Sequence, residues 1–298
     1  MTRKAVVLVV ALAALCLGLP MLDRQPTTSA GPGRPLIAGG RVHASYQPND
    51  GKIFVLIIGN DARSGNPDRS RADAIHIAGI NTKTMKGGIL NFPRDSWVNI
   101  PGAGISKMNE ALYRGGPRLL AQTLENLTGI HIDYWVMTGF QGFVGALDRL
   151  GWVDYRIKRD IYDPTGSGAA IPAGTKKLGP RNALAYVRTR HSFANGDIDR
   201  TTNQGRFLMA LLRKLRTDVA RSPAALLEWT SVARKYTRLD LGPDELFRLG
   251  VLTSQVKPKD VDLVTVPVSV GSVGAASVVF ISPGAQSIYA RFRKNASL

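Results

Sequence analysis

The amino-acid sequence predicts an α/β sandwich with a mixed central sheet. Apolar runs of strand length alternate along the chain with segments of helical period, which is typical of this fold class. The hydrophobic content of 44% is enough to bury a sizeable core, and no internal repeat is visible. The folded part is expected over residues 51–298, a length that suits one α/β domain.

Apolar runs mark the expected strands. Residues 53–58 (IFVLII) form an unbroken apolar run that ends at Gly59, which is typical of a strand buried on both faces. Further strands are expected at residues 74–80, 88–92, 132–137, 261–268 and 277–281. The polar residues 81–86 predict a short turn that sends the third strand back beside the second.

Helical periodicity marks three segments. Pro117 is favourable at a first helical position, so a helix is expected to begin there and to end before Gly129. A short helix is expected over residues 140–150. The clearest helix begins at Thr201. Its apolar face contains Phe207, Leu208, Leu211, Leu212, Leu215 and Val219.

Residues 1–22 are predicted to form a membrane anchor. Arg3 and Lys4 precede an apolar run over residues 5–22. About 18 helical residues reach roughly 27 Å, close to the ~30 Å hydrocarbon core of a bilayer. The basic flank predicts a single pass through the cytoplasmic membrane with the folded domain extracytoplasmic, and a cleaved signal sequence is the alternative. The Pro- and Gly-containing residues 23–50 are expected to form a linker.

The chain is strongly basic, with 39 Lys and Arg against 22 Asp and Glu and a net charge of +17. This excess predicts acidic partners such as anionic lipid, phosphorylated molecules or nucleic acid. Export disfavours nucleic acid, and the most basic stretch, residues 181–216, interleaves few aromatics for base stacking. Cys16 is the only cysteine, which excludes an intrachain disulfide and a cysteine-based metal site.

Charged residues gather where the first three strands meet. Asp61 follows the first strand and Asp73 precedes the second, so antiparallel pairing would bring both carboxylates to one sheet edge. Arg94, after the third strand, is expected at the same edge. Two carboxylates with nearby arginines suit a Mg²⁺ ion that holds a phosphate. The alternative is that the aspartates cap turns and strands and the arginines are solvated.

A second polar cluster precedes and enters the long helix. Arg188 and Arg190 would point to one side if their segment is extended. Arg200 and Gln204 are four residues apart and therefore neighbours on a helical face. The start of that helix offers free N–H groups for an anion. The alternative is a charged surface helix, and His191 by itself is expected to be structural.

Five short stretches carry a family resemblance. They are GNDAR, RSRADAI, NFPRDSWV, KMNEALYRGG and YVRTRHSFANGDIDRTTNQGRF. In this order and spacing they resemble the LytR-CpsA-Psr family of cell-wall ligases, over about residues 54–215 and more weakly over 262–290. The resemblance implies a three-layer α/β/α domain in a membrane-anchored enzyme. Such an enzyme moves a glycopolymer from a polyprenyl-diphosphate carrier onto peptidoglycan and forms a phosphodiester.

The resemblance also implies roles for individual residues. Asp61 and Asp73 would hold Mg²⁺. The residues that would clamp the diphosphate are Arg71, Arg94, Arg188, Arg190, Arg200 and Gln204, with Arg63 in the same motif as Asp61. The carrier tail would need an apolar groove, for which the candidates are Phe140, Phe143, Val144, Leu147, Leu208, Leu211 and Leu212. Gly205 departs from the family pattern, in which a polar residue is frequent.

Two other functions stay open at this point. A polyprenyl-diphosphate phosphohydrolase would use the same residues with water as the acceptor. A non-catalytic protein that binds anionic glycopolymer or lipid would need the basic surface but not the metal. The glycopolymer is not specified by these patterns, and arabinogalactan, teichoic acid and capsule are all compatible with them.

Overall fold

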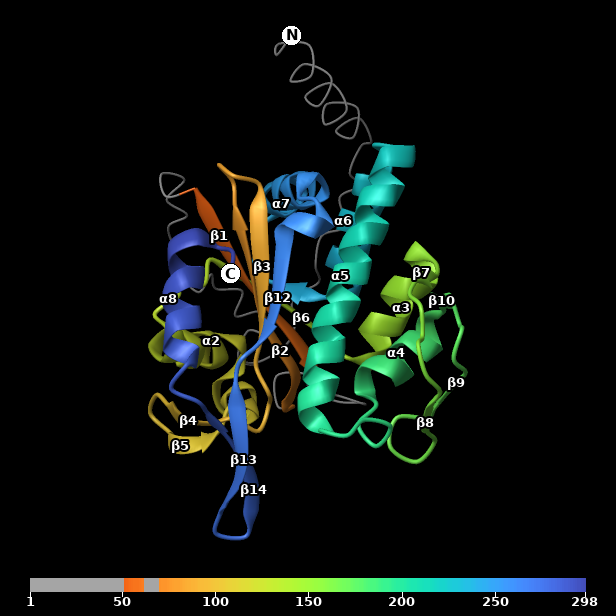
Figure 1. The fold of residues 1–298 in the computed structure, drawn as a ribbon. Helices are drawn as coiled ribbons and strands as arrows, with labels where there is room; N and C mark the ends of the chain where they lie inside the picture. The colour runs from red at the N-terminus through yellow and green to blue at the C-terminus, as the bar shows by residue number, and fades with distance from the viewer. Residues whose placement is uncertain (1–50, 62–69) are drawn as a thin grey trace, which may run out of the picture. The chain divides into compact units, whose positions relative to one another are not determined.

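A computed structural model describes residues 51–61 and 70–298, and a six-stranded mixed sheet lies at its centre (Figure 1). The strand order is β11-β6-β1-β2-β3-β12. β1 pairs antiparallel with β2 and parallel with β6, and β3 pairs antiparallel with β2 and parallel with β12. The strands are β1 (Lys52–Asn60), β2 (Ala72–Asn81), β3 (Lys86–Asn91), β6 (Tyr134–Thr138), β11 (Arg238–Leu239) and β12 (Val261–Thr265). The expected segments 1–22 and 23–50, and Arg63, lie outside the described residues.

Helices cover both faces of the sheet, which confirms the three-layer α/β/α architecture (Figure 1). One face carries α2 (Asn109–Thr128) and α8 (Ala285–Asn295). The other faces α5 (Asp197–Arg221), α6 (Ala225–Tyr236) and α7 (Pro243–Gln255), and α3 (Phe140–Leu150) and α4 (Pro180–Arg188) lie beside α5. No helix in the described part of the chain combines the length and apolar character that a membrane crossing needs.

Alternation along β1 explains why both layers form. Phe54, Leu56 and Ile58 enter the core that α2 and α8 complete, whereas Ile53 and Val55 enter a second cluster with residues near and on α7. Successive side chains of a strand point to opposite faces, so an unbroken apolar run buries both. The strand was therefore predicted correctly as one buried on both sides.

Four two-stranded antiparallel sheets lie outside this core. They are β4 (Trp97–Ile100) with β5 (Gly104–Lys107), β7 (Val153–Asp154) with β10 (Lys177–Leu178), β8 (Ile161–Asp163) with β9 (Ala169–Ile171), and β13 (Val268–Val273) with β14 (Ala276–Ile281). A 3₁₀ turn, η3 (Pro258–Asp260), precedes β12. The β13–β14 hairpin projects beyond the helices in Figure 1.

The three largest differences from the expected boundaries have physical reasons or clear positions. α2 begins at Asn109 and kinks at Gly115 and Gly116, so Pro117 restarts a helix that has already begun. The expected strand 261–268 ends at Thr265, because Pro267 has no N–H for a sheet ladder and the chain then enters β13. α5 begins at Asp197, four residues before the predicted start.

The core beneath α8 depends on one aromatic side chain. Phe292 is fully buried and meets the Phe54 ring edge-on at 5.3 Å. Gly79 and Gly88 leave the space that it fills, because a Cβ on either would lie 2.8 Å from the Phe292 ring. The sheet is therefore built with glycines where the helix brings an aromatic ring closest.

We expect Phe292→Ala to lower the free energy of unfolding by about 3–5 kcal/mol, because it removes a fully buried ring and leaves a cavity. Urea denaturation followed by circular dichroism measures this. Arg291→Ala, an exposed position on the same helix, should stay within about 0.5 kcal/mol of the wild type. A loss below about 1 kcal/mol for Phe292→Ala would contradict this packing.

Candidate functional site

Asp73 occupies a β-bulge between β1 and β2. Gly59 pairs with Ala74 and Asn60 pairs with Ala72, so Asp73 has no ladder partner of its own on β1. Bulges free a backbone group and redirect a side chain, and they are frequent beside active sites. The bulge thus leaves the carbonyl of Asp73 available to side chains from α5.

Asp61, directly after β1, is hydrogen-bonded to Arg71, directly before β2. Its Oδ1 accepts a hydrogen bond from the Arg71 N–H at 3.0 Å, and its own N–H donates to the Arg71 carbonyl at 3.2 Å. The predicted antiparallel pairing is confirmed, and it places Asp61 and Asp73 at the same sheet edge. Part of the alternative interpretation also holds, because the Asp61 carboxylate accepts a hydrogen bond from the backbone just before β2.

Arg94 is held by carboxylates at that edge. Its Nη1 donates a short hydrogen bond to Asp73 Oδ1, and its Nε lies 3.5 Å from Asp197 Oδ1 and 3.9 Å from Asp95 Oδ2. Burial lowers the pKa of Arg94, but the three carboxylates outweigh burial and leave the pKa above its ordinary value. Arg94 is therefore a fixed cation at the end of β3.

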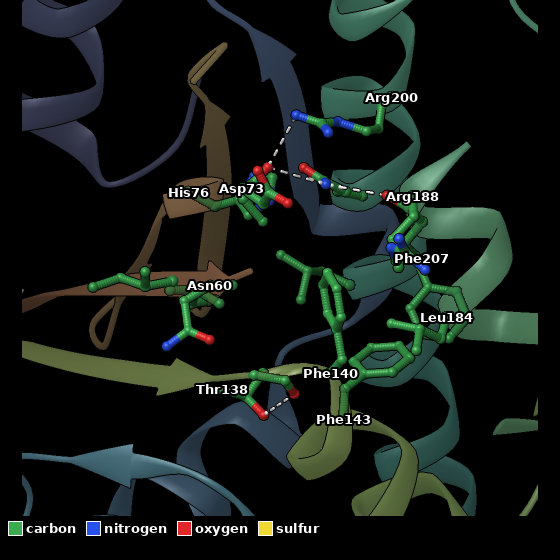
Figure 2. Close-up of a pocket in the computed structure, with 18 residues that line it drawn as sticks. Asn60, Asp73, His76, Thr138, Phe140, Phe143, Leu184, Arg188, Arg200 and Phe207 are labelled. Carbon is green, nitrogen blue, oxygen red and sulfur yellow. Dashed lines mark hydrogen bonds between the residues drawn. The ribbon is translucent and has the colours of Figure 1, made fainter. Parts of the chain in front are cut away.

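Two α5 side chains reach the freed carbonyl of Asp73. Arg200 Nη2 and Gln204 Nε2 each donate to it at 3.3 Å, and Gln204 Nε2 also donates to the Val187 carbonyl at 3.1 Å. Arg200 Nη2 lies 2.8 Å from Asp197 Oδ1. Figure 2 shows Arg200 and Asp73 converging from α5 and β2. The predicted helical neighbours Arg200 and Gln204 thus share one target.

Burial leaves two guanidinium nitrogens of this cluster without a hydrogen-bond acceptor among the described residues. Arg200 is 4% exposed, and burial lowers its pKa, with the nearby Arg94 and Arg190 lowering it further against the opposing effect of Asp197. Within the described residues, Arg94 Nε and Arg200 Nε are buried without a hydrogen-bond acceptor. Unused donors on buried guanidinium groups suit phosphate oxygens, which accept bidentate hydrogen bonds from arginine.

The segment that carries Arg188 and Arg190 is not extended, so that expectation is wrong. Arg188 is the last residue of α4, and its guanidinium carbon lies 4.4 Å from the centre of the Phe140 ring. Arg190 lies in the following loop, and its N–H donates to Asp163 Oδ2 at 3.2 Å. Helix α4 continues through Arg188, so strand alternation does not align the two side chains.

Asp163 anchors this loop, and sequence reasoning missed it. It is 2% exposed and also accepts hydrogen bonds from His191 Nδ1 at 2.8 Å and from the Gly166 N–H at 3.1 Å. Burial raises the pKa of Asp163, but the hydrogen bonds from His191 and Arg190 outweigh burial and lower it. His191 contacts Asp163 in the structural manner that was predicted.

An apolar pocket of about 110 Å³ opens beside these charges (Figure 2). Its polar lining comprises Asn60, Asp73, His76, Thr138, Arg188, Arg200 and Gln204. Its apolar lining includes Ile57, Ile58, Phe140, Phe143, Leu184, Val187, Phe207 and Leu208. Three groove candidates, Phe140, Phe143 and Leu208, line it, whereas Val144, Leu147, Leu211 and Leu212 do not. The pocket thus joins an apolar wall to a cationic end.

The remaining predicted residues lie around this centre. Arg71 is exposed, and its Nε donates to Glu110 Oε1 at 2.9 Å instead of lining the pocket. Asp197 was given no role from sequence, although its position three residues before Arg200 in one helix was a usable signal. It also occupies the first turn of α5, where a free anion site was expected.

Neutral His76 forms part of the pocket wall. Asn91 Nδ2 donates to the Val264 carbonyl at 3.2 Å, which turns Asn91 Oδ1 toward His76 Nδ1 at 2.8 Å. His76 therefore carries its proton on Nδ1. Gly205 makes room for this pair, because a Cβ there would collide with the Asn91 amide. The departure from the family pattern at Gly205 thus has a steric reason.

The donor chemistry at the sheet edge suits Mg²⁺. Asp61 and Asp73 each use Oδ1 in a hydrogen bond, and within the described residues Oδ2 of each makes none. Mg²⁺ typically takes one or two carboxylates and completes its shell with water and phosphate oxygens. Residues 51–61 and 70–298 contain no group of three or more His, Cys, Asp or Glu placed to hold a metal.

Comparisons with known proteins identify a matching family and a matching fold. The model of the LytR_cpsA_psr family matches residues 28–295. The "Probable cell wall biosynthesis protein LcpB" of Corynebacterium glutamicum is 37% identical over 185 residues, which cover 58% of this chain and 43% of that protein. TagT of Bacillus subtilis, named a polyisoprenyl-teichoic acid–peptidoglycan teichoic acid transferase, is 34% identical over 180 residues, 58% of this chain and 55% of TagT. A solved structure of TagT bound to LI-WTA aligns with a TM-score of 0.71 at 25% identity, covering 85% of this chain and 93% of that one. The chain thus matches about half the length of these two curated relatives.

His76 should make stability depend on pH. Burial lowers its pKa from 6.5 to about 4, against the opposing hydrogen bond to Asn91, so the unfolded chain binds this proton more readily. Above pH 6.5 the protonation of His76 does not reduce the free energy of unfolding. As the pH drops from 6.5 to 4, this group lowers the free energy of unfolding by about 3 kcal/mol. His76→Asn keeps a hydrogen-bond donor near the position of Nδ1 but does not titrate. The free energy of unfolding of this variant, measured by urea denaturation, should therefore fall less than that of the wild type over this pH range. Parallel pH curves for wild type and variant would contradict the assignment, and His131→Asn, at an exposed position, serves as the control.

Proposed function

The chain belongs to the LytR_cpsA_psr family, and we propose that it transfers a glycopolymer from a polyprenyl-diphosphate carrier onto peptidoglycan. One observation carries the proposal: a pocket with an apolar wall ends at Asp73, Arg188 and Arg200. A polyprenyl diphosphate has the same polarity, since an apolar chain ends in a multiply charged head. The name of the relative TagT includes this class of carrier and this acceptor.

The head of the donor would lie among the arginines. Arg200 is buried, Arg94 is partly buried, and Asp197 fixes both. Each has a guanidinium nitrogen available to phosphate oxygens. Arg188 adds a cation at the pocket wall. Fixed charges in a partly desolvated site stabilise phosphate more strongly than solvated ones, because no reorganisation is needed when the anion arrives.

The tail would enter between α3, α4 and α5. A pocket of about 110 Å³ is smaller than the roughly 300–1,000 Å³ of typical ligand sites. A long polyprenyl chain could therefore enter only if the apolar side chains of α3, α4 and α5 moved apart. Phe140 and Phe143 of α3 face Leu184 of α4 and Phe207 of α5 across this wall in Figure 2. Tail binding would thus be coupled to side-chain movement along these helices.

The chemistry follows from the charges. An acceptor hydroxyl oxygen forms a bond to the glycan-bearing phosphorus, and the bond from that phosphorus to the bridging oxygen breaks. The polyprenyl monophosphate leaves with the electron pair, and the hydroxyl loses its proton. Arg94, Arg188 and Arg200 offset the charge that grows on the leaving group. Mg²⁺, held by Asp61 and Asp73, would supply further neutralisation of the phosphates when bound.

The test is a transfer assay with the full chain. A polyprenyl-diphosphate disaccharide and peptidoglycan fragments are incubated with Mg²⁺, and mass spectrometry identifies the products. We expect a phosphodiester between the disaccharide and peptidoglycan, together with polyprenyl monophosphate. Release of the disaccharide phosphate with and without peptidoglycan would instead identify a phosphohydrolase. Since peptidoglycan lies outside the cytoplasmic membrane, the proposal includes the extracytoplasmic location that the N-terminal sequence predicts.

Variants at the sheet edge should separate metal and phosphate binding. Asp73→Asn should reduce both transfer and the response to Mg²⁺, because it removes a carboxylate from the metal and from Arg94. Arg188→Lys should keep the Mg²⁺ response but lower kcat/KM by roughly 10²-fold, about 2.7 kcal/mol of transition-state stabilisation, because an ammonium cannot form the bidentate fork.

Titration of Mg²⁺ against initial rate for each variant provides the measurement. Arg234→Ser removes an exposed charge on α6 and serves as the matched control, with wild-type rates expected. Wild-type turnover and metal response in Asp73→Asn would show that this edge is not the active site.

A further inference from the structure

The turn between β3 and β4 is fixed by hydrogen bonds along its whole length. Four consecutive carbonyls, those of residues 93–96, each accept a backbone hydrogen bond. In order along the turn, the donors are the N–H groups of Ser96, Asn109, Val279 and Met108, at 3.1, 3.0, 3.0 and 2.8 Å. The turn is thus bonded to the start of α2 and to β14. The backbone that carries Asp95 is therefore held in one position before a ligand arrives.

The Asp95 side chain has one oxygen that is held and one that is free. Lys107 Nζ lies 3.3 Å from Asp95 Oδ1, and Asn109 Nδ2 donates to the same oxygen at 3.5 Å. Asp95 Oδ2 lies 3.9 Å from Arg94 Nε, which is too far for a hydrogen bond. Within residues 51–61 and 70–298 no group donates to Oδ2, and this oxygen is open to solvent. It can therefore accept a hydrogen bond from an incoming hydroxyl.

Other carboxylates at Arg94 are less suited to accept a proton. In the described part of the chain, the carboxylates within 4.0 Å of Arg94 are those of Asp73, Asp95 and Asp197. Asp73 binds Arg94 and would also hold Mg²⁺, and cations on both sides make a carboxylate a weak base. Both oxygens of Asp197 are buried, so an acceptor hydroxyl cannot reach them. Asp95 combines contact with Arg94 and an accessible oxygen.

Asp95 lies one contact beyond the charged end of the pocket. Asp73 lines the pocket and binds Arg94, whereas neither Arg94 nor Asp95 lines it. The other polar partners of Asp95 also lie outside the lining. In Figure 2 the Phe143 ring of the apolar wall lies at the opposite end of the pocket from Asp73 and Arg200. The order from the apolar wall outward is therefore Asp73, then Arg94, then Asp95.

This order matches an in-line displacement at phosphorus. The attacking and leaving oxygens of a phosphoryl transfer lie roughly in line, on opposite sides of the phosphorus. The leaving polyprenyl phosphate stays with the tail in the pocket, so the acceptor hydroxyl must approach from the side that faces away from the pocket. Asp95 Oδ2 is the free carboxylate oxygen on that side of Arg94.

We propose that Asp95 is the general base of the transfer. This inference rests on the proposed function and adds the proton acceptor to it. The acceptor hydroxyl oxygen donates a lone pair to the glycan-bearing phosphorus, and its proton moves to Asp95 Oδ2 while the bond to the bridging oxygen breaks. Lys107 and Asn109 hold Oδ1, which leaves Oδ2 toward the acceptor. The proton then passes to water, because the Asp95 side chain is 23% exposed.

Transfer kinetics of the full chain test the assignment, with the polyprenyl-diphosphate disaccharide as donor and peptidoglycan fragments as acceptor. Asp95→Asn keeps the shape of the side chain but removes the base, and should lower kcat by roughly 10²–10⁴-fold. Asp95→Gly should lose a similar factor. Added formate should restore part of the rate of Asp95→Gly, because a free carboxylate can enter the vacated space and accept the proton. Formate should not restore Asp95→Asn, whose amide fills that space.

Donor binding separates this role from a structural one. Isothermal titration calorimetry with a polyprenyl diphosphate should give Asp95→Asn a Kd close to that of the wild type, because Asp73 and Asp197 still hold Arg94. Asp154→Asn is the matched control. It also removes an aspartate paired with a lysine across two short strands, since Asp154 lies 3.7 Å from Lys177 and is exposed. This variant should keep the wild-type kcat.

Two results would overturn the inference. They are wild-type kcat in Asp95→Asn, and a loss in Asp95→Gly that formate does not restore and that accompanies weakened donor binding. The second result would assign Asp95 to the support of Arg94. Wild type that releases the disaccharide phosphate to water, with formate restoring this hydrolysis in Asp95→Gly, would support the inference and overturn only the proposed function. Wild type with neither reaction would overturn both.

Discussion

The contact between Asp73 and Arg94 is the interaction on which the rest of the site depends. It joins the bulge of β2 to the end of β3, and through Asp197 it extends to Arg200 on α5. The bulge contributes a second connection, because the freed Asp73 carbonyl accepts hydrogen bonds from Arg200 and Gln204. One residue therefore fixes the sheet edge, the start of the long helix and the orientation of two guanidinium groups. Loss of Arg94 would leave the Asp73 carboxylate partly buried without its cation, which costs more than the pair itself contributes.

Burial and ion pairing fix the positions of Arg94 and Arg200, and this sets their proposed role. Arg200 is buried, Arg94 is partly buried, and Asp197 holds both, so their positions are set before a ligand arrives. Such preorganised charges suit a reacting phosphate, whose transition state they can stabilise without moving.

A glycine and two buried polar residues position side chains and backbone at the site. Gly205 lets α5 approach β3 closely enough for the Asn91 amide to lie beneath it, and Asn91 in turn orients His76 at the pocket wall. Asp163 performs a similar task for the loop after α4, where it holds the backbone of Arg190 and the ring of His191. In both places a buried hydrogen-bonding group outside the predicted site sets the position of residues at the site. Buried polar groups tolerate little displacement, since each lost hydrogen bond exposes an unsatisfied group to an apolar environment.

The sequence by itself determined the α/β class with a mixed sheet, most strands of the central sheet, the long helix and the sheet edge where Asp61, Asp73 and Arg94 meet. Those features follow from apolar periodicity and short turns, which are local properties of the chain. Tertiary structure alone decided that Asp73 occupies a bulge, that Arg188 is helical and that Arg71 pairs with Glu110. It also decided which apolar residues line the pocket, because core and cavity residues have the same pattern in sequence. The role of Asp163 depends on contacts between residues about 30 positions apart. Such contacts are set by how helices and hairpins pack, and packing leaves no period in the sequence from which they could be predicted.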